Sequence, residues 1–288
     1  RIIMILDLRF NAGINRQFNK IFNNISYLNR NNFNNFIDSI SRPLIHNVDW
    51  WSESPASRNT YACPLFHYFC CINLILKIFN ENIYNINKIY VDSNELKKII
   101  NNILKQKKLK NVEVIYKLDF FIFLKLFFKK CFYYEWFFIK RLIQIIIARI
   151  SKKYQNSNIP KKNIVLIDTF LTKEYLNNDR WYGNLWNHLD EDVKSEIFFV
   201  PSIPNTSLKN IKFIYKTLRQ GPRNTIIKED YLTFYDLIYA YQHKYRVKKL
   251  KLGSYSLSGI DLSGIVVEVM QNNRDIYTLM ESLLTYRF

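Results

Sequence analysis

The chain has 288 residues, 48% hydrophobic and 16% aromatic, and its 42 Lys and Arg residues outnumber 24 Asp and Glu residues to give a net charge of +18. This composition can form an apolar core, which excludes a wholly disordered chain, and the absence of a fixed period excludes a repeat fold. A charge of this size attracts nucleic acid, acidic membrane surfaces and phosphorylated substrates alike, so its distribution along the chain must decide between them.

The first 60 residues predict an irregular N-terminal segment. Residues 2–6 can form a strand, but the Asn-rich stretch that follows has poor periodicity and indicates loops and short helices. Near the end of this segment, residues 49–60 combine two indoles with hydroxyls, an amide and a cation. Aromatic faces stack on sugar rings, and such polar groups bind hydroxyls or phosphates; the alternative is a capped loop whose indoles fill the core. The candidate substrate-binding residues here are Trp50, Trp51, Ser57, Arg58 and Asn59.

Residues 61–118 predict a first β-α-β unit. The apolar stretch 65–79 is too short to span a bilayer and indicates a buried helix. A strand at 88–91 ends at Asp92-Ser93, which are good helix caps, and apolar residues then recur with helical spacing up to a second strand at 112–116. Two strands joined by a crossover helix predict a parallel sheet.

Residues 119–158 predict one or two basic amphipathic helices. At roughly 100° per residue, Lys125, Lys129, Lys140 and Arg141 fall within one arc of about 160°, while Phe, Leu and Ile residues lie outside it. Charges interrupt the segment too often for a transmembrane helix. Two alternatives stay open: the helix lies in the interface of an anionic membrane, or its apolar face packs on the sheet as an ordinary crossover helix.

Residues 159–288 predict a second α/β series, with strands at 164–167 and 197–200 and helices after them. The continuous apolar run at 164–167 is typical of a strand buried on both faces. In open α/β sheets, ligands bind beyond the carboxyl ends of the strands, which directs attention to the polar residues that follow. We identify Asp168 or Asp179 as a candidate general base for a hydroxyl nucleophile, although Asp179 can equally be a helix cap. The substrate-binding candidates beside them are Thr169, Arg180, Trp181 and Tyr182.

The remaining motifs are less specific. The basic run at 244–251 is typical of a solvated face, with phosphate binding as the alternative. Four dispersed His residues and four Cys residues without a CxxC pair predict no metal site, and we expect the thiols to be reduced and buried. The chain lacks the Walker, GxGxxG, HExxH and GxSxG motifs, which argues against NTPases, dinucleotide oxidoreductases, zinc proteases and serine hydrolases.

Several sequence blocks together resemble a group of bacterial proteins encoded with surface-polysaccharide genes, which are similar to glycosyltransferases of the two-Rossmann (GT-B) type. The resemblance covers most of residues 44–288. Its blocks are DWWSESPASRNTYACPLFHYFC, IVLIDTF, NDRWYGNLW, IFFVPSI, SGIDLSGIVVEV and LLTYRF.

The resemblance implies a GT-B-like fold and transfer of a sugar from a nucleotide donor to a lipid-linked or surface glycan, without a metal or other cofactor. The enzyme would be peripheral at the cytoplasmic face of the membrane, and residues 1–288 would be the acceptor-side portion of a longer transferase. Asp168 or Asp179 would deprotonate the acceptor, the two arginines would steady phosphate charge, and the aromatic residues would form sugar platforms.

Two other functions stay open. The same basic helix would serve a non-enzymatic protein that anchors an assembly to an anionic membrane surface. Nucleic-acid binding rests on net charge and aromatic content alone, because the sequence has no RNP-like, helix-turn-helix or zinc-finger pattern. Nucleic-acid binding is therefore the less favoured of these two functions.

Overall fold

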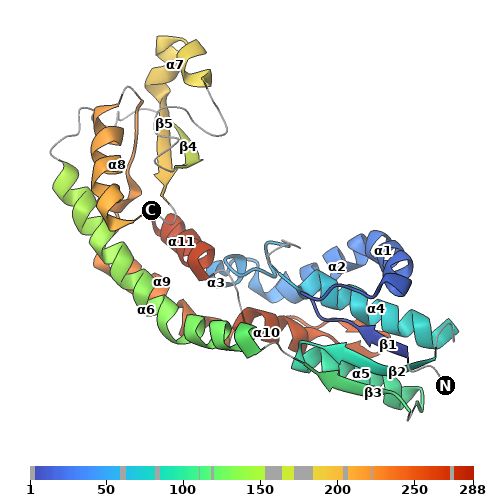
Figure 1. The fold of residues 1–288 in the computed structure, drawn as a ribbon. Coiled ribbons are helices and arrows are strands. Elements are labelled where there is room, and N and C mark those ends of the chain that lie inside the picture. The colour runs from blue at the N-terminus through green and yellow to red at the C-terminus, as the bar shows by residue number, and fades with distance from the viewer. Residues whose placement is uncertain are drawn as a thin grey trace. The chain divides into compact units, whose positions relative to one another are not determined.

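The computed structural model describes the chain except residues 1–3, 59–62, 82–84, 110, 118–119, 153–163, 172–183, 204–206, 222 and 273–275, and except the side chains at 120–123, 125–126, 129–131, 170, 185 and 208–209. The protein is a mixed α/β chain in two compact units (Figure 1). Each unit is assembled from two stretches: unit 1 from Arg1–Tyr133 and His243–Met280, and unit 2 from Tyr134–Gln242 and Glu281–Phe288. The chain returns to unit 1 after residue 242.

Unit 1 is built around a three-stranded parallel sheet with the order β1-β2-β3 (Figure 1). The predicted β-α-β unit is confirmed: β2 and β3 are parallel, and α5 connects them. The strands are β1 (Met4–Asp7), β2 (Ile86–Val91) and β3 (Glu113–Tyr116), with the small antiparallel pair β6 (Ser256–Leu257) and β7 (Ile260–Asp261); the helices of this unit are α1 (Asn19–Leu28), α2 (Arg30–Ser41), α3 (Val48–Trp51), α4 (Leu65–Glu81), α5 (Asn94–Gln106) and α10 (Ser263–Gln271).

Helix α5 forms where the sequence predicts it, for the expected reasons. The Ser93 hydroxyl accepts a hydrogen bond from the backbone N–H of Leu96 at 3.0 Å and so caps the helix. The apolar face is buried in the main core, against which α4 and α10 also pack. Its buried residues are Leu96, Ile99, Ile100, Ile103 and Leu104.

In the part that the structure describes, the N-terminal segment forms the expected strand and short helices, and it is more regular than the sequence indicates. Residues 19–41 form α1 and α2, and β1 pairs in parallel with β2. Phe33, Phe36, Ile37 and Ile40 are buried along one side of α2. This helical spacing is present in the sequence, but the Asn residues between these positions obscure it because Asn has low helix propensity.

Unit 2 contains a two-stranded parallel sheet, β4 (Val165–Phe170) and β5 (Ile197–Ser202), in which Asp168 pairs with Val200 (Figure 1). Both strands were predicted, but burial of the first strand on both faces was not correct: Val165 and Leu166 are 53% and 51% exposed. The remaining elements are α7 (Glu191–Glu196), α8 (Leu208–Gln220), the short 3-10 helices Leu185–His188 and Lys228–Asp230, and three helices that contribute residues to both units: α6 (Phe120–Ser151), α9 (Phe234–Arg246) and α11 (Ile276–Arg287).

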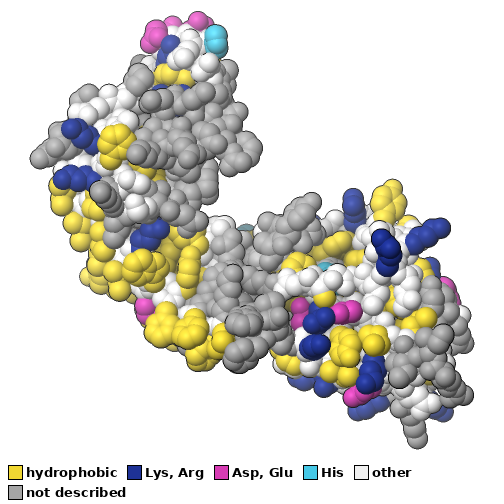
Figure 2. All heavy atoms as spheres, viewed as in Figure 1, with side chains coloured by type: hydrophobic (Ala, Val, Ile, Leu, Met, Phe, Trp, Pro, Cys, Tyr) yellow, Lys and Arg dark blue, Asp and Glu magenta, His cyan; other side chains and the backbone are white. Residues whose placement is uncertain are grey.

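Helix α6 is a single helix. A crossover helix packs its apolar face on a sheet, whereas several apolar residues of α6 are exposed. The basic and polar arc predicted from the sequence carries buried residues, among them Arg141 and Gln144. Large apolar residues of the opposite arc are exposed instead, and Figure 2 shows hydrophobic side chains gathered over this helix. None of the helices in the described part of the chain is long and apolar enough to cross a membrane. The predicted apolar face of α6 is therefore only partly packed: Ile145 is buried, whereas Ile139 and Ile146 are exposed.

Candidate functional site

The two indoles of the 49–60 cluster have opposite environments. Trp50 is fully buried, and its Nε1 donates to the Ser41 hydroxyl at 3.1 Å. Trp51 is 46% exposed, with its Nε1 held by the carbonyl oxygen of Ile45 at 2.8 Å. A fully buried indole offers no face to a sugar, so Trp50 fills the core as in the alternative reading of this loop, and Trp51 alone keeps an accessible ring.

The polar residues of this cluster are engaged in local contacts. The Ser57 hydroxyl donates to the carbonyl oxygen of Ser54 at 2.8 Å, which closes a turn. Arg58 has a φ of 54°, and its guanidinium lies 2.5 Å from a carboxylate oxygen of Asp38 on α2. Asn59 lies outside the described residues. Of the described candidates in this cluster, burial excludes Trp50 as a sugar platform, and binding by Trp51, Ser57 and Arg58 stays a prediction.

Two carboxylates of this cluster, Asp49 and Glu53, belong to a buried charged group that the sequence did not indicate. The imidazole of His243 is fully buried, with Nδ1 2.7 Å from Asp49 and Nε2 2.8 Å from Glu53. Arg246 forms a bidentate ion pair with the same Asp49: its Nε donates to Oδ2 and its Nη2 donates to Oδ1, each at 2.7 Å. Arg246 belongs to the basic run at 244–251, for which the sequence predicts a solvated face. Part of this run therefore pairs with a carboxylate of the buried group.

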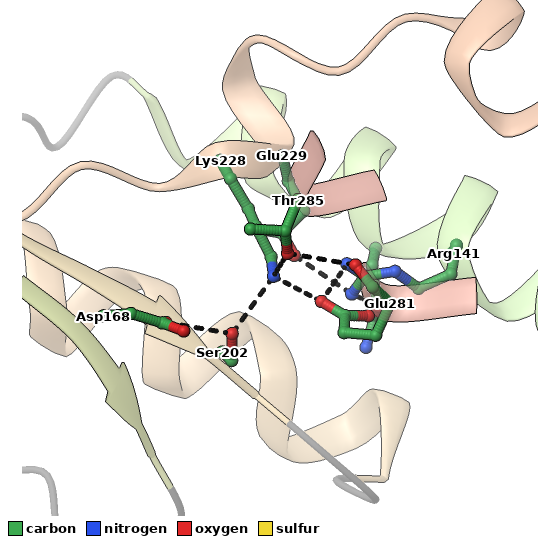
Figure 3. Close-up of polar contacts among 8 residues, drawn as sticks. Arg141, Asp168, Ser202, Lys228, Glu229, Glu281 and Thr285 are labelled. Carbon is green, nitrogen blue, oxygen red and sulfur yellow. Dashed lines mark hydrogen bonds and ion pairs between the residues drawn. The ribbon is translucent and has the colours of Figure 1, made fainter. Parts of the chain in front are cut away.

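The candidate base Asp168 lies near the carboxyl end of β4 and is exposed. The Ser202 hydroxyl, at the end of the neighbouring strand β5, donates to Asp168 Oδ1 at 3.3 Å (Figure 3). Thr169 is buried, and its hydroxyl has no hydrogen-bond partner among the described residues. The other candidates of this site, Asp179, Arg180, Trp181 and Tyr182, lie outside the described residues, so their position relative to Asp168 stays a prediction.

Behind Ser202 lies a lysine that the sequence did not indicate. Lys228 is fully buried, and its ammonium donates to the hydroxyls of Ser202 at 3.1 Å and Thr285 at 3.2 Å (Figure 3). The same ammonium forms an ion pair with Glu281. An ammonium only donates, so Ser202 accepts from Lys228 and keeps its own hydrogen for Asp168. The hydrogen bonds therefore run in one direction, from Lys228 through Ser202 to Asp168.

Arg141 completes the buried charges of this group. Its guanidinium lies 3.0 Å from carboxylate oxygens of both Glu229 and Glu281. Burial alone would raise the pKa of Glu281, but the adjacent Arg141 and Lys228 outweigh burial and hold this pKa below its usual value. The group thus holds two cations and two carboxylates, and this balance lets the charges stay inside the protein.

This arrangement is suited to proton transfer at an exposed carboxylate. Asp168 is accessible to a hydroxyl substrate, while Ser202 fixes the orientation of its carboxylate from the neighbouring strand. A carboxylate placed in this way can accept the proton of an attacking hydroxyl. The buried ammonium lies one hydroxyl away and contributes a fixed positive charge on the inner side of the site.

Unit 1 also collects charged residues at the carboxyl edge of its sheet. Asp7 is the last residue of β1 and forms an ion pair with Arg9 at 2.6 Å. Asp92 follows β2 and accepts hydrogen bonds from the backbone N–H of Phe10 and the hydroxyl of Tyr68. Asp92 thus ties segments together instead of capping α5. The rule that directs attention to strand ends would have found Asp7 and Arg9 had the first strand been assigned with its end at residue 7.

The N-terminus of α5, a position where β-α-β units often bind phosphate, already holds an anion. The carboxylate of Glu268 on α10 accepts from the backbone N–H groups of Asn94 and Glu95 at 2.9 Å each and from the Ser93 hydroxyl at 2.5 Å. In this structure a phosphate can enter this position only by displacing Glu268. The edge of the unit 2 sheet, with its exposed carboxylate, is therefore the better candidate site.

Among the described residues, no three His, Cys, Asp or Glu side chains are grouped as metal ligands. The three described cysteines, Cys63, Cys70 and Cys71, are buried and reduced, as expected from the sequence. A comparison of the chain with protein-family models, curated proteins and solved structures found no match.

Proposed function

We propose that the chain is a glycosyltransferase, or the acceptor-side portion of one, that transfers a sugar from a nucleotide donor during surface-polysaccharide synthesis. Asp168 acts as the general base that removes the proton of the acceptor hydroxyl. Ser202 orients the carboxylate of this base. The nucleotide sugar enters as a substrate and no further cofactor is required.

One observation carries this proposal. The residue that the strand-end rule selects from the sequence, Asp168, is exposed and accepts a hydrogen bond from the end of the adjacent parallel strand. The resemblance of the surrounding blocks to surface-polysaccharide proteins supplies the substrate class. A GT-B arrangement belongs to the same proposal.

The test is a donor screen with the full chain. We expect binding of at least one nucleotide sugar and slow donor hydrolysis or transfer. Asp168→Asn should lower the rate about 100-fold or more, because the amide cannot accept the proton. The matched control is Asp190→Asn, at an exposed position that makes no side-chain cap.

The results distinguish failure of the enzyme proposal from failure of the role assigned to Asp168. If no nucleotide sugar binds or is hydrolysed, the enzyme proposal fails. If Asp168→Asn and Asp190→Asn have the same rate as the original chain while transfer is measurable, the enzyme stands and Asp168 loses its role. Circular dichroism and thermal unfolding of both variants show whether a lost rate reflects a lost fold.

The same proposal includes location at the cytoplasmic face of the membrane, as a peripheral protein, where lipid-linked acceptors are available. A second candidate function, a non-enzymatic membrane-surface scaffold, is favoured by the exposed apolar residues of α6. The two candidates differ in the expected result of the donor screen, and both include binding to a membrane surface.

A further inference from the structure

Helix α6 carries a continuous apolar surface, here called the α6 stripe. Four large apolar residues in the part of this helix that belongs to unit 2 are 48% to 59% exposed. At roughly 100° per residue, their positions fall within an arc of about 80°. They are Trp136, Ile139, Ile146 and Ile150.

The opposite side of the helix explains why this stripe faces outward. Phe137, Arg141, Gln144 and Ala148 are buried, and Arg141 is held by the carboxylates of Glu229 and Glu281. The ion pairs of Arg141 therefore fix the rotation of this part of α6 about its axis. Single exposed apolar residues are ordinary, but a stripe along several turns of one helix marks an interaction surface.

We propose that the α6 stripe lies flat on an anionic lipid bilayer, with Trp136, Ile139 and Ile146 at the boundary between headgroups and acyl chains. Charge selects this occupant. Arg149 and Lys152 are exposed at the end of α6, and the whole chain carries +18. Anionic headgroups attract such a chain, whereas a second copy of it repels, so a lipid surface is favoured over self-association. An amphipathic helix with an aromatic and aliphatic face and flanking cations has the chemistry of an interfacial helix.

The test is flotation of the full chain with vesicles of phosphatidylcholine alone and with vesicles that also contain phosphatidylglycerol. We expect binding to the anionic vesicles that weakens as salt rises. Ile139→Ser with Ile146→Ser should weaken binding about tenfold or more, because two buried aliphatic contacts are lost. The matched control is Tyr27→Ser with Leu28→Ser, at positions 69% and 64% exposed in unit 1.

Tryptophan fluorescence gives a second measurement at a defined position. Trp136 belongs to the α6 stripe, so its emission should shift to shorter wavelength with anionic vesicles. Trp136→Phe should remove most of that shift, while Trp51→Phe, which changes an indole 46% exposed in unit 1, should preserve it.

Three results would overturn the proposal: no flotation with anionic vesicles, equal flotation of the two double variants, or a lipid-free dimer that only the stripe substitutions abolish. The last result would assign the stripe to a second copy of the chain. Flotation requires no catalysis, so these results leave the transferase proposal untouched, and a failed donor screen leaves the membrane proposal untouched.

Discussion

His243 illustrates how a single buried side chain is governed by its partners. Both ring nitrogens face carboxylate oxygens, which requires a hydrogen on each nitrogen and therefore a charged imidazolium. Burial alone would lower the pKa of His243, but the hydrogen bonds to Asp49 and Glu53 outweigh burial and raise it. For Asp49, burial would raise the pKa, but His243 and Arg246 lower it to about 2.

These pKa shifts predict the pH range in which the ion-pair group stabilises the protein. The raised pKa of His243 contributes stability that is complete below about pH 6.5 and is lost as the pH rises through the folded-state pKa. The lowered pKa of Asp49 contributes stability above its ordinary pKa of 3.8, which is lost as the pH falls toward about 2. Between these limits the ion-pair group is fully formed.

We therefore expect the free energy of unfolding to fall above neutral pH, by at most about 1.4 kcal/mol per pH unit for this one proton. His243→Gln should remove this slope and lower stability by about 3 kcal/mol near pH 6, because the buried carboxylates lose the imidazolium and only Asp49 keeps Arg246. Urea unfolding across the pH range measures both effects. His188→Gln, at an exposed position, should keep the original profile, and a His243→Gln profile with the original slope would contradict the assignment.

Ser202 gives the second prediction at this scale. Replacing Ser202 with Ala removes the hydroxyl between Lys228 and Asp168, so the carboxylate loses its fixed orientation. We expect the transfer rate to fall about ten- to hundredfold with donor affinity unchanged. Ser195→Ala, which removes an exposed hydroxyl bound to the carbonyl oxygen of Asp192, serves as the control. Equal rates for the two variants would show that Ser202 does not orient the base.

At the scale of single elements, α2 depends on a glycine far away in sequence. The backbone N–H of Gly253 donates to the carbonyl oxygen of Ile40 at 3.0 Å, and a Cβ at residue 253 would lie 2.1 Å from the carbonyl oxygen of Ser39. Gly253→Ala should therefore destabilise unit 1 by about 1–3 kcal/mol or more, measured by thermal unfolding. Gly264→Ala is the matched control, because its Cβ would meet only the flexible end of Glu95 and Ala favours the α10 helix. A Gly253→Ala variant as stable as the control would contradict the close packing.

The elements that could be predicted are those with complete local signals. The strand, cap and apolar spacing of β2 and α5 lie within twenty residues, and the structure follows them. The outward face of α6 could not be predicted, because Arg141 is neutralised by Glu229 and Glu281, which lie 88 and 140 residues further along the chain. A basic helix face was assumed to be solvated, whereas distant carboxylates made it the inner face.

The same reason limits prediction of the candidate site. Asp168 could be selected from its place after an apolar run, but its partners could not. Lys228, Glu229 and Asp230 form a charged triplet that is typical of a solvated turn, yet each one pairs inward, with Glu281, Arg141 and Arg219 respectively. Trp50 and Trp51 are adjacent in sequence and alike in chemistry, so only the fold decides which indole is buried.

At the scale of the whole molecule, the last eight residues belong to unit 2, although the segment before them belongs to unit 1. A chain ending at Met280 loses Glu281 and Thr285, which leaves the buried Lys228 without two of its partners. We expect unit 2 to lose about 3–5 kcal/mol of stability, since breaking a buried ion pair leaves an uncompensated charge. Hydrogen exchange should rise in β5 and α8 and stay slow in β2 and α5.

The control for this truncation is a chain that lacks only Phe288 and keeps Glu281. It should retain the exchange rates of the full chain in both units. Uniformly faster exchange in the chain ending at Met280, including β2 and α5, would mean that the C-terminal residues support the whole molecule and not unit 2 alone.

The carboxylate of Glu268 occupies the N-terminus of α5 and therefore competes with other anions for this position. This carboxylate is tethered by the same chain, so its effective concentration at the Ser93–Glu95 amides is in the millimolar range or above. Free phosphate or a nucleotide diphosphate at lower concentration is outcompeted there. Added phosphate should therefore leave the stability of the original chain almost unchanged, and a Glu268→Ala variant should convert the same amides into a position that phosphate stabilises.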